Sequence, residues 1–296
     1  MSLTPTYHKD TYPSISSTNP SLTQAGKNII ITGGGGGIGF EIARSFAKAS
    51  ASKVIIIGRR AGLLDEALAK LRKEFQGRPT EFIAHQGDIG SDASITSLWE
   101  FLHSRNILVH VLVLNAAHPY PFAALMESFD INVGGNFLMS AHFVKQTLRP
   151  TGLKLHLVNV STACVHMHPM ENQTPYSTSK AAFTALLGRI ADERSVDDVQ
   201  IVSFHPGLLY SESMAKAFGR EAFAWDEFAL PADFAVWASS PDASWLHGRF
   251  VHAHWDVDEL KADREILKRL QEEGGYLKVG IQGLNAGALP VIGILY

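Results

Sequence analysis

Short apolar segments rich in β-branched residues alternate with longer segments of helical period, and this alternation constrains the fold most strongly. The expected strands are 27–32, 54–57, 81–85, 109–114, 155–160, 200–204 and 249–252. The expected helices between them include 38–49, 63–75, 91–103, 122–148 and 175–194. Continuously apolar strands that alternate with helices form a parallel sheet covered on both faces. The sequence therefore predicts an α/β fold, a doubly wound parallel sheet of about seven strands with helices on both faces.

The 296 residues contain no internal linker and no repeat, so we expect one domain over 27–278. Residues 1–26 are rich in Ser, Thr and Pro and lack the apolar run of a signal peptide. We expect this leader to be extended, either against the domain or disordered. Residues 279–296 carry no charge, but glycines, a proline and amides make them a poor membrane helix. We expect an apolar tail that docks on the domain or on a sister subunit.

Composition excludes several classes of partner. The chain has 26 basic and 29 acidic residues, a formal net charge of −3, which is unlike a nucleic-acid binder or a polybasic membrane binder. We therefore expect neither nucleic acid nor membrane as a partner. Cys164 is the only cysteine, so an internal disulfide cannot form, and a reducing, cytoplasmic setting is favoured.

Polar residues follow the predicted strands, and in an open parallel sheet such positions converge on one crevice. They are Thr32, Arg59, Asp88, Asn115, Thr162 and Pro206. The first of them opens a glycine-rich turn that fits two patterns. Gly34, Gly36 and Gly39 match G-x-G-x-x-G, and Thr32, Gly33, Gly37 and Gly39 match T-G-x-x-x-G-x-G. Between a strand and a helix, such a turn predicts dinucleotide binding. Glycine lets the backbone approach the ligand closely, and the free N–H groups of the helix N-terminus can donate hydrogen bonds to a pyrophosphate.

The end of the second strand carries Arg59 and Arg60 and no acid. An acid there would hold the ribose 2′-hydroxyl of NAD, whereas arginine suits the 2′-phosphate of NADP. Cations at a helix start are also disfavoured unless an anion compensates them. The sequence favours NADP(H) as the cofactor, with NAD(H) as the alternative.

Tyr176 and Lys180 lie four residues apart in a helical segment and therefore share a face. A free phenol titrates near about pH 10, and a nearby ammonium together with a cationic nicotinamide ring would lower its pKa. A hydroxyl after the preceding strand could hold the substrate oxygen. Thr162 is the first candidate for that hydroxyl and Ser161 the second.

Together these motifs resemble the short-chain dehydrogenase/reductase family over residues 26–254, which implies a Rossmann-type fold and makes 27–278 the catalytic domain. The resemblance implies a catalytic tetrad of Asn132, Thr162, Tyr176 and Lys180, in which Asn132 holds a water linked to the lysine. It implies cofactor contacts from Thr32, Gly33, Gly37, Ile38, Gly39, Asp88, Ile89, Asn115, Ala116, Tyr176, Lys180, Pro206, Gly207 and Ser211, beside those of Arg59 and Arg60.

Two departures from the family pattern concern the hydroxyl. Threonine replaces the usual serine at 162, and the spacing to Tyr176 is one residue longer than usual, which leaves Ser161 and Thr162 as alternatives. Residues 12–15 and 255–260 are similar to a branch common in fungal genomes, where secondary metabolism is the expected setting. The resemblance also implies a homodimer or homotetramer, with 122–148 and 175–194 as the packing helices.

These features predict an NADP(H)-dependent oxidoreductase that interconverts a ketone and a secondary alcohol. Residues 210–230 should form a lid, and their aromatic side chains favour a bulky hydrophobic substrate. Two alternatives stay open: a non-redox dehydratase, isomerase or cyclase on the same scaffold, and a cofactor-sensing binding protein. His166 and His168 have no third partner at a metal-ligand spacing, so no metal is expected, and His205 is expected only to shape the site.

Overall fold

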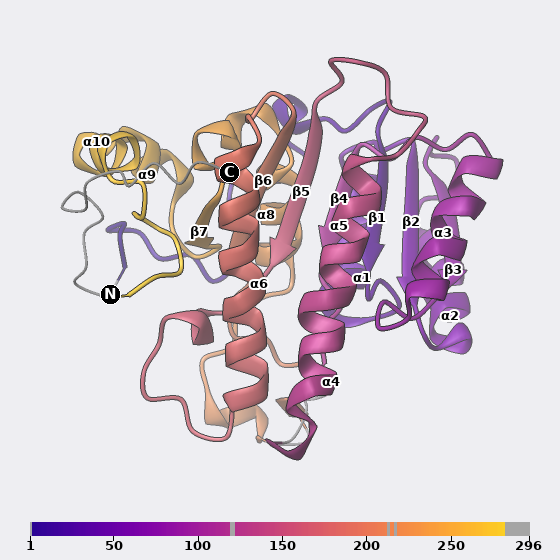
Figure 1. The fold of residues 1–296 in the computed structure, drawn as a ribbon. Helices are drawn as coiled ribbons and strands as arrows, with labels where there is room; N and C mark the ends of the chain where they lie inside the picture. The colour runs from indigo at the N-terminus through magenta and orange to yellow at the C-terminus, as the bar shows by residue number, and fades with distance from the viewer. Residues whose placement is uncertain (1, 119–121, 212–213, 216–217, 282–296) are drawn as a thin grey trace, which may run out of the picture.

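The computed structural model describes residues 2–118, 122–211, 214–215 and 218–281. Its centre is a seven-stranded sheet in the order β3-β2-β1-β4-β5-β6-β7, in which every neighbouring pair is parallel (Figure 1). The strands are β1 (Asn28–Thr32), β2 (Lys53–Gly58), β3 (Glu81–Gln86), β4 (Val111–Leu114), β5 (Leu155–Val160), β6 (Val199–His205) and β7 (Arg249–His252). The order reverses between β1 and β4, and open parallel sheets bind their ligands beyond the carboxyl ends of the strands at such a reversal. The predicted single-domain fold is confirmed.

Two layers of helices cover the sheet, as doubly wound topology requires. One layer consists of α1 (Gly37–Lys48), α2 (Ala61–Glu74) and α8 (Ala229–Ala238). The other consists of α3 (Asp92–Ser104), α5 (Asn136–Val144) and α6 (Thr174–Glu193), which lie side by side in Figure 1. Two further helices, α9 (Val257–Ala262) and α10 (Arg264–Glu272), lie at the edge beyond β7 (Figure 1).

The predicted single helix over 122–148 is wrong in detail. The structure divides it into a 3-10 turn η2 (Phe122–Ala124), a short α4 (Leu125–Phe129), a π-helical segment η3 (Asp130–Gly135) and α5. At Gly135 the backbone packs so closely on the carbonyl oxygen of Ile89 that a Cβ would overlap it. The wider π turn therefore lets the helix pass the loop after β3, a contact between distant segments that periodicity cannot reveal.

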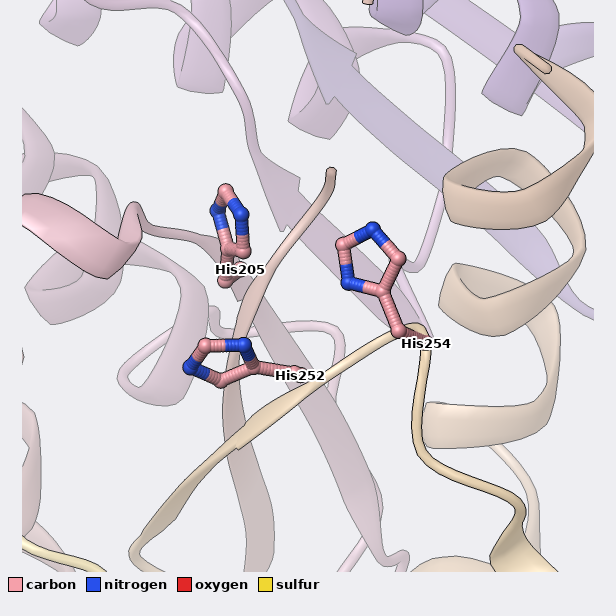
Figure 2. Close-up of side chains that lie close together, drawn as sticks. All are labelled: His205, His252 and His254. Atoms are coloured by element: carbon pink, nitrogen blue, oxygen red, sulfur yellow. The ribbon is translucent and has the colours of Figure 1, made fainter. Parts of the chain in front are cut away.

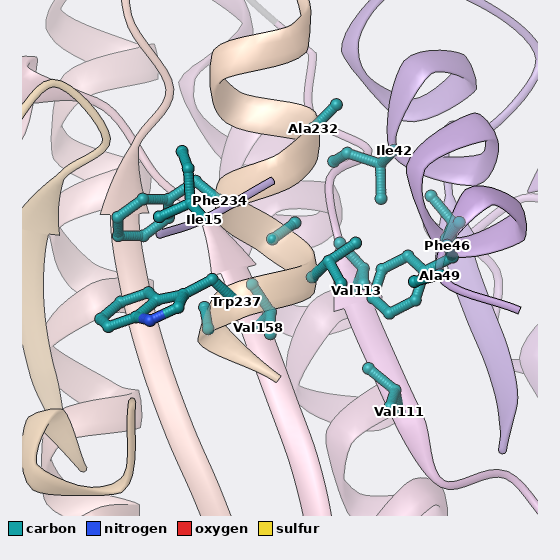
Figure 3. Packing of buried hydrophobic residues seen from close by; sticks show 14 of the residues in the cluster. Ile15, Ile42, Phe46, Ala49, Val111, Val113, Val158, Ala232, Phe234 and Trp237 are labelled. Carbon is teal, nitrogen blue, oxygen red and sulfur yellow. The ribbon is translucent and has the colours of Figure 1, made fainter. Parts of the chain in front are cut away.

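The hydrophobic core fills the space between the sheet and each layer of helices. On the α1 side, one cluster contains Ile42 and Phe46 of α1 together with Phe234 and Trp237 of α8, and Figure 3 shows these two aromatic rings beside Ile15. The buried Asp233 carboxylate of α8 accepts a hydrogen bond from Ser45 of α1 at 2.6 Å, which joins the two helices. Burial of aromatic and branched side chains on this scale supplies the main stabilisation of the domain.

The leader lies against the domain. Ile15 and Leu22 are buried in the core on the α1 side, and a 3-10 turn, η1 (Pro20–Leu22), precedes β1. Tyr12 donates a hydrogen bond from its hydroxyl to the carbonyl of Trp255 at 3.0 Å. The expected tail over 279–296 falls almost entirely outside the described residues. Among the helices that are described, none has the length and apolar character needed to cross a membrane.

Candidate active site

Thr32 connects the glycine-rich turn to the end of β4. Its buried hydroxyl accepts hydrogen bonds from the backbone N–H groups of Asn115 and Ala116 at 3.0 and 2.9 Å. In return, the Asn115 side chain donates to the Thr32 carbonyl at 2.9 Å. These three bonds fix the spacing of β1 and β4 at the reversal of strand order, where the crevice opens.

The glycines of the turn satisfy two different requirements. Gly33 and Gly37 have φ of +71° and +53°, which favour glycine, and a Cβ at Gly39 would overlap the Gly33 carbonyl. Gly36 stands at the N-cap of α1 and offers no side-chain cap, and the first turn of this helix contains no acid. The first N–H groups of α1, at Gly37 and Ile38 and beyond, are therefore available to an anion.

Arg59 and Arg60 lie directly after β2, where α2 begins. Both are exposed, Arg60 is the N-cap residue, and neither forms an ion pair with any residue that the structure describes. Two adjacent cations at a helix N-terminus oppose the helix dipole, so a bound anion would stabilise them.

The loop after β3 presents Asp88 and Ile89 near the same edge. The Asp88 carboxylate accepts a hydrogen bond from the Gly90 N–H at 2.9 Å, and Ser94 of α3 bonds to the Asp88 backbone. Ile89 is buried against the face of the core that α3 and α5 cover. The loop is thus rigidly held beside the π-helical segment η3.

The structure distinguishes the two candidate hydroxyls at the end of β5. The hydroxyl of Ser161 lies 2.7 Å from the hydroxyl of Thr184 on α6, and both residues are buried. Thr162 instead lies close enough to the phenol of Tyr176 to lower its pKa, and its hydroxyl accepts from the Cys164 N–H at 3.3 Å. The geometry therefore pairs Thr162, and not Ser161, with the tyrosine.

Burial raises the pKa of Tyr176 to about 12, with the neighbouring Cys164 as a smaller cause and Thr162 acting in the opposite direction. The prediction that Lys180 and a cationic nicotinamide ring together lower this pKa concerns the cofactor-bound protein and stays a prediction. Without the cofactor, desolvation of the phenol is the largest cause of its raised pKa. The phenol is consequently neutral at physiological pH.

Lys180 is 3% exposed and donates to the Val160 carbonyl at 2.5 Å, which places its ammonium at the end of β5. Burial lowers the pKa of Lys180 to about 8. A buried amine with a depressed pKa can exchange a proton near neutrality, which is a property of functional sites.

Asn132 lies in η3 and is completely buried. Its side chain bonds to both backbone groups of His118 and donates to the Ser179 hydroxyl at 3.0 Å. Ser179 in turn donates to the Tyr176 carbonyl on α6. Asn132 therefore joins the loop after β4 to the helix that carries Tyr176 and Lys180. Ser179 escaped the sequence analysis because one serine among several in a helix gives no distinguishing signal.

After β6, Pro206 and Gly207 lead toward Ser211, and Gly207 has a φ of +104°. A Cβ at Gly207 would lie 2.7 Å from a carboxylate oxygen of Asp226, which pairs with His254 at 2.8 Å. The same carboxylate accepts from the Leu208 N–H. This buried Asp226–His254 pair, which holds the segment after β6, was also missed because its members come from separate segments.

The described part of 210–230, the segment expected to form a lid, contains a cluster of aromatic rings. Phe223 contacts both Phe218 and Trp225 at ring distances of 5.2 and 5.1 Å, and Trp225 also meets Tyr210. Phe218 and Phe223 are each 42% exposed. This segment thus carries apolar surface that its own packing does not bury.

The parallel sheet, the glycine-rich turn and the helix with Tyr176 and Lys180 are typical of dinucleotide-dependent α/β enzymes. Comparison with known proteins agrees with this class. A family model described as short chain dehydrogenase matches residues 27–222. The chain belongs to the short-chain dehydrogenase/reductase family, whose members are oxidoreductases that use nicotinamide dinucleotides.

Two relatives and one solved structure illustrate the similarity. The short chain dehydrogenase/reductase nsrO of Aspergillus novofumigatus is 33% identical over 93% of this chain and 95% of its own length. The enzyme AacuD of Aspergillus aculeatus, of the same description, is 32% identical over 94% and 96%. A 7α-hydroxysteroid dehydrogenase with NADH and 7-oxo glycochenodeoxycholic acid superposes with a TM-score of 0.71 at 24% identity, covering 79% of this chain and 95% of its own.

Proposed function

We propose that this protein is an NADP(H)-dependent oxidoreductase that interconverts a ketone and a secondary alcohol on a bulky hydrophobic substrate. The observation that carries the proposal is that Thr162, after the end of β5, lies close enough to Tyr176 to lower its pKa, with the buried Lys180 one helical turn away from the tyrosine. Two neighbouring hydroxyls can both donate hydrogen bonds to one carbonyl or carbinol oxygen.

The described residues fit a nicotinamide dinucleotide. The uncapped N-terminus of α1, at Gly37, Ile38 and Gly39, would hold the pyrophosphate. Arg59 and Arg60 would hold a ribose 2′-phosphate, which makes NADP(H) the preferred form over NAD(H). The remaining contacts would come from Thr32, Gly33, Asp88, Ile89, Asn115, Ala116, Tyr176, Lys180, Pro206, Gly207 and Ser211. When bound, the nicotinamide supplies or accepts a hydride at its C4 atom.

Side chains of the protein provide the acid-base catalysis. In the reducing direction, Thr162 donates a hydrogen bond to the carbonyl oxygen and Tyr176 gives that oxygen a proton. A phenol whose pKa is raised to about 12 holds its proton at neutral pH, as an acid must before transfer. Lys180, with its pKa lowered to about 8, returns a proton toward the tyrosine, through a water held at Asn132.

The lid supports a hydrophobic substrate over a sugar or a small acid. Phe218, Phe223 and Trp225 contact one another and leave apolar surface exposed, which a bulky apolar molecule would cover. Such substrates suit the secondary metabolism that the resemblance suggests, in a reducing cytoplasm where Cys164 stays free.

We also propose a homodimer or homotetramer that packs through α5 and α6. Leu125, Met126 and Phe137, in α4 and α5, are 37%, 69% and 45% exposed, so this face presents apolar side chains to a partner. A second copy of the chain would remove them from water.

The test follows NADPH absorbance with a panel of hydrophobic ketones, for the wild type and for Tyr176→Phe. Steady oxidation that Tyr176→Phe abolishes, while NADPH still binds, supports the proposal. Product formation without NADPH oxidation would assign a non-redox enzyme, and tight NADPH binding without any turnover would assign a cofactor sensor. A Tyr176→Phe enzyme with full activity would remove the proposed acid.

A further inference from the structure

Three histidines converge beyond the carboxyl ends of β6 and β7. His205 and His252 are opposite one another in the register of these two strands, and His254 follows β7 by two residues. One potential ligand nitrogen from each ring lies within 4.8 Å of the others. Figure 2 shows the three rings turned toward a common centre.

The outward side of two of these rings is already occupied. His254 bonds through Nε2 to a carboxylate oxygen of Asp226 at 2.8 Å, and both side chains are almost fully buried. His252 bonds through Nε2 to Nε2 of His166 at 3.0 Å. An imidazole that donates its Nε2 proton to a carboxylate carries a free lone pair on Nδ1. This is the arrangement in which metal-ligating histidines are commonly oriented.

Two inward nitrogens have no partner within the described part of the chain. The Nδ1 atoms of His205 and His254 are buried, and neither forms a hydrogen bond there. An unpaired buried polar atom costs about 1 to 3 kcal/mol, so a ligand that accepted both lone pairs would remove a real penalty. Water could bridge them, but several imidazole nitrogens around one point are the usual donor set for zinc.

We propose that His205, His252 and His254 form a binding site for a divalent transition metal ion, with Zn²⁺ as the ligand. Tetrahedral Zn²⁺ with Zn–N bonds of about 2.0–2.1 Å places its nitrogens about 3.4 Å apart. Nitrogens within 4.8 Å of one another reach this spacing through small rotations of the side chains. Three histidines leave one position of the tetrahedron for a water or another oxygen ligand.

The ion would brace the segment that follows β6. His205 precedes Pro206 directly, and Gly207 packs against Asp226 and His254, so metal, carboxylate and backbone would form one unit. His166 extends this unit to the loop after Thr162 through its bond to His252. The inference does not depend on the proposed substrate or on the cofactor preference.

The alternative is that the three rings only pack as aromatic groups. His252 stacks on Trp255 with centroids 4.5 Å apart and planes at 9°, and His205 lies 4.9 Å from His252. Packing alone requires no ion and gives no metal stoichiometry. Metal binding by the chelator-treated full-length protein therefore separates the two explanations.

The experiment titrates that protein with Zn²⁺ against a chromogenic chelator and with Co²⁺ as a spectroscopic probe. The variants are His252→Gln, Asp226→Asn and, as a matched control, His103→Gln, which removes an exposed histidine of α3. We expect one Zn²⁺ per chain and the absorption bands of four-coordinate Co²⁺. His252→Gln should weaken Zn²⁺ binding at least tenfold, Asp226→Asn about 10- to 100-fold, and His103→Gln not at all.

A wild type without four-coordinate Co²⁺ bands overturns the proposal, as does Zn²⁺ affinity that His252→Gln leaves unchanged. Loss of affinity in His103→Gln equal to that in His252→Gln would assign binding to scattered surface histidines and also overturn it. Circular dichroism checks the fold of each variant. If a variant does not fold, X-ray absorption of the Zn²⁺-loaded wild type decides. A coordination shell with three imidazole ligands supports the site, and a shell of oxygen ligands alone refutes it.

Discussion

Thr162 lies beside the phenol of Tyr176 and lowers its pKa, although the two residues come from different parts of the chain, the loop directly after β5 and the first turn of α6. Ser161 precedes Thr162 directly, yet its hydroxyl lies 2.7 Å from the hydroxyl of Thr184, further along α6. Adjacent residues at a strand end point to opposite sides, so only one hydroxyl can reach the crevice.

Thr162→Val should therefore lower kcat/KM by about 100-fold or more, because valine keeps the shape but removes the hydrogen-bond donor for the substrate oxygen. The matched control is Ser161→Ala, which should keep activity within about twofold. That control should cost about 1 kcal/mol of stability, since the buried Thr184 hydroxyl loses its 2.7 Å partner and keeps the 3.4 Å hydrogen bond from the Asn159 side chain. Ketone reduction and urea unfolding measure both effects. The reverse pattern of activities would assign the substrate hydroxyl to Ser161.

Arg59→Ser combined with Arg60→Ser should raise the Kd for NADPH at least tenfold, which corresponds to about 1.4 kcal/mol. The Kd for NADH should change little, because NADH lacks the 2′-phosphate that the guanidinium groups would hold. The control Arg78→Ser removes an exposed arginine beyond the C-terminal end of α2 and should alter neither constant. Fluorescence titration with both nucleotides provides the measurement. Equal losses for the two nucleotides would argue against 2′-phosphate recognition.

Sequence patterns predicted the strands, most helices and the glycine turn because these depend on local periodicity and on backbone requirements. Thr32 and Asn115 were expected at strand ends, and the structure shows their mutual hydrogen bonds. The break of the helix near Gly135 could not be predicted, since it arises from contact with Ile89 far away in the chain.

The same limit applies to the candidate site. Spacing gave His166 and His168 no third ligand, so no metal was expected, whereas the structure brings His166 to His252, 86 residues away. The raised pKa of Tyr176 was also unpredictable, because it depends on how deeply the phenol is buried. Both features depend on tertiary packing between separate strands.

Lys180→Met should abolish turnover and yet stabilise the protein at pH 7. Burial lowers the pKa of Lys180 from its ordinary 10.5 to about 8, so between these values the unfolded chain binds a proton that the folded chain has released. The free energy of unfolding of the wild type should therefore rise with pH across this window. From pH 7 to 9.5 the gain from this group is about 2 kcal/mol.

Urea unfolding at the two pH values measures the effect as the difference between wild type and variant. Lys180→Met should lack this gain, whereas Lys268→Met, at an exposed position of α10, should behave as the wild type does. An identical pH dependence in wild type and Lys180→Met would mean that the lysine is not desolvated in the folded protein.

Phe137→Asp should convert the proposed oligomer into monomers. Phe137 lies on α5 and is 45% exposed, so its ring presents apolar area to a partner subunit. A carboxylate at this position would have to lose its hydration in the interface, and an unpaired buried charge there costs several kcal/mol.

Phe218→Asp is the matched control, since Phe218 is 42% exposed but belongs to the expected lid segment. Sedimentation velocity at micromolar concentration should show a dimer or tetramer for the wild type and for Phe218→Asp, but a monomer for Phe137→Asp. A monomeric wild type, or an oligomer that Phe137→Asp leaves intact, would move the interface away from α5.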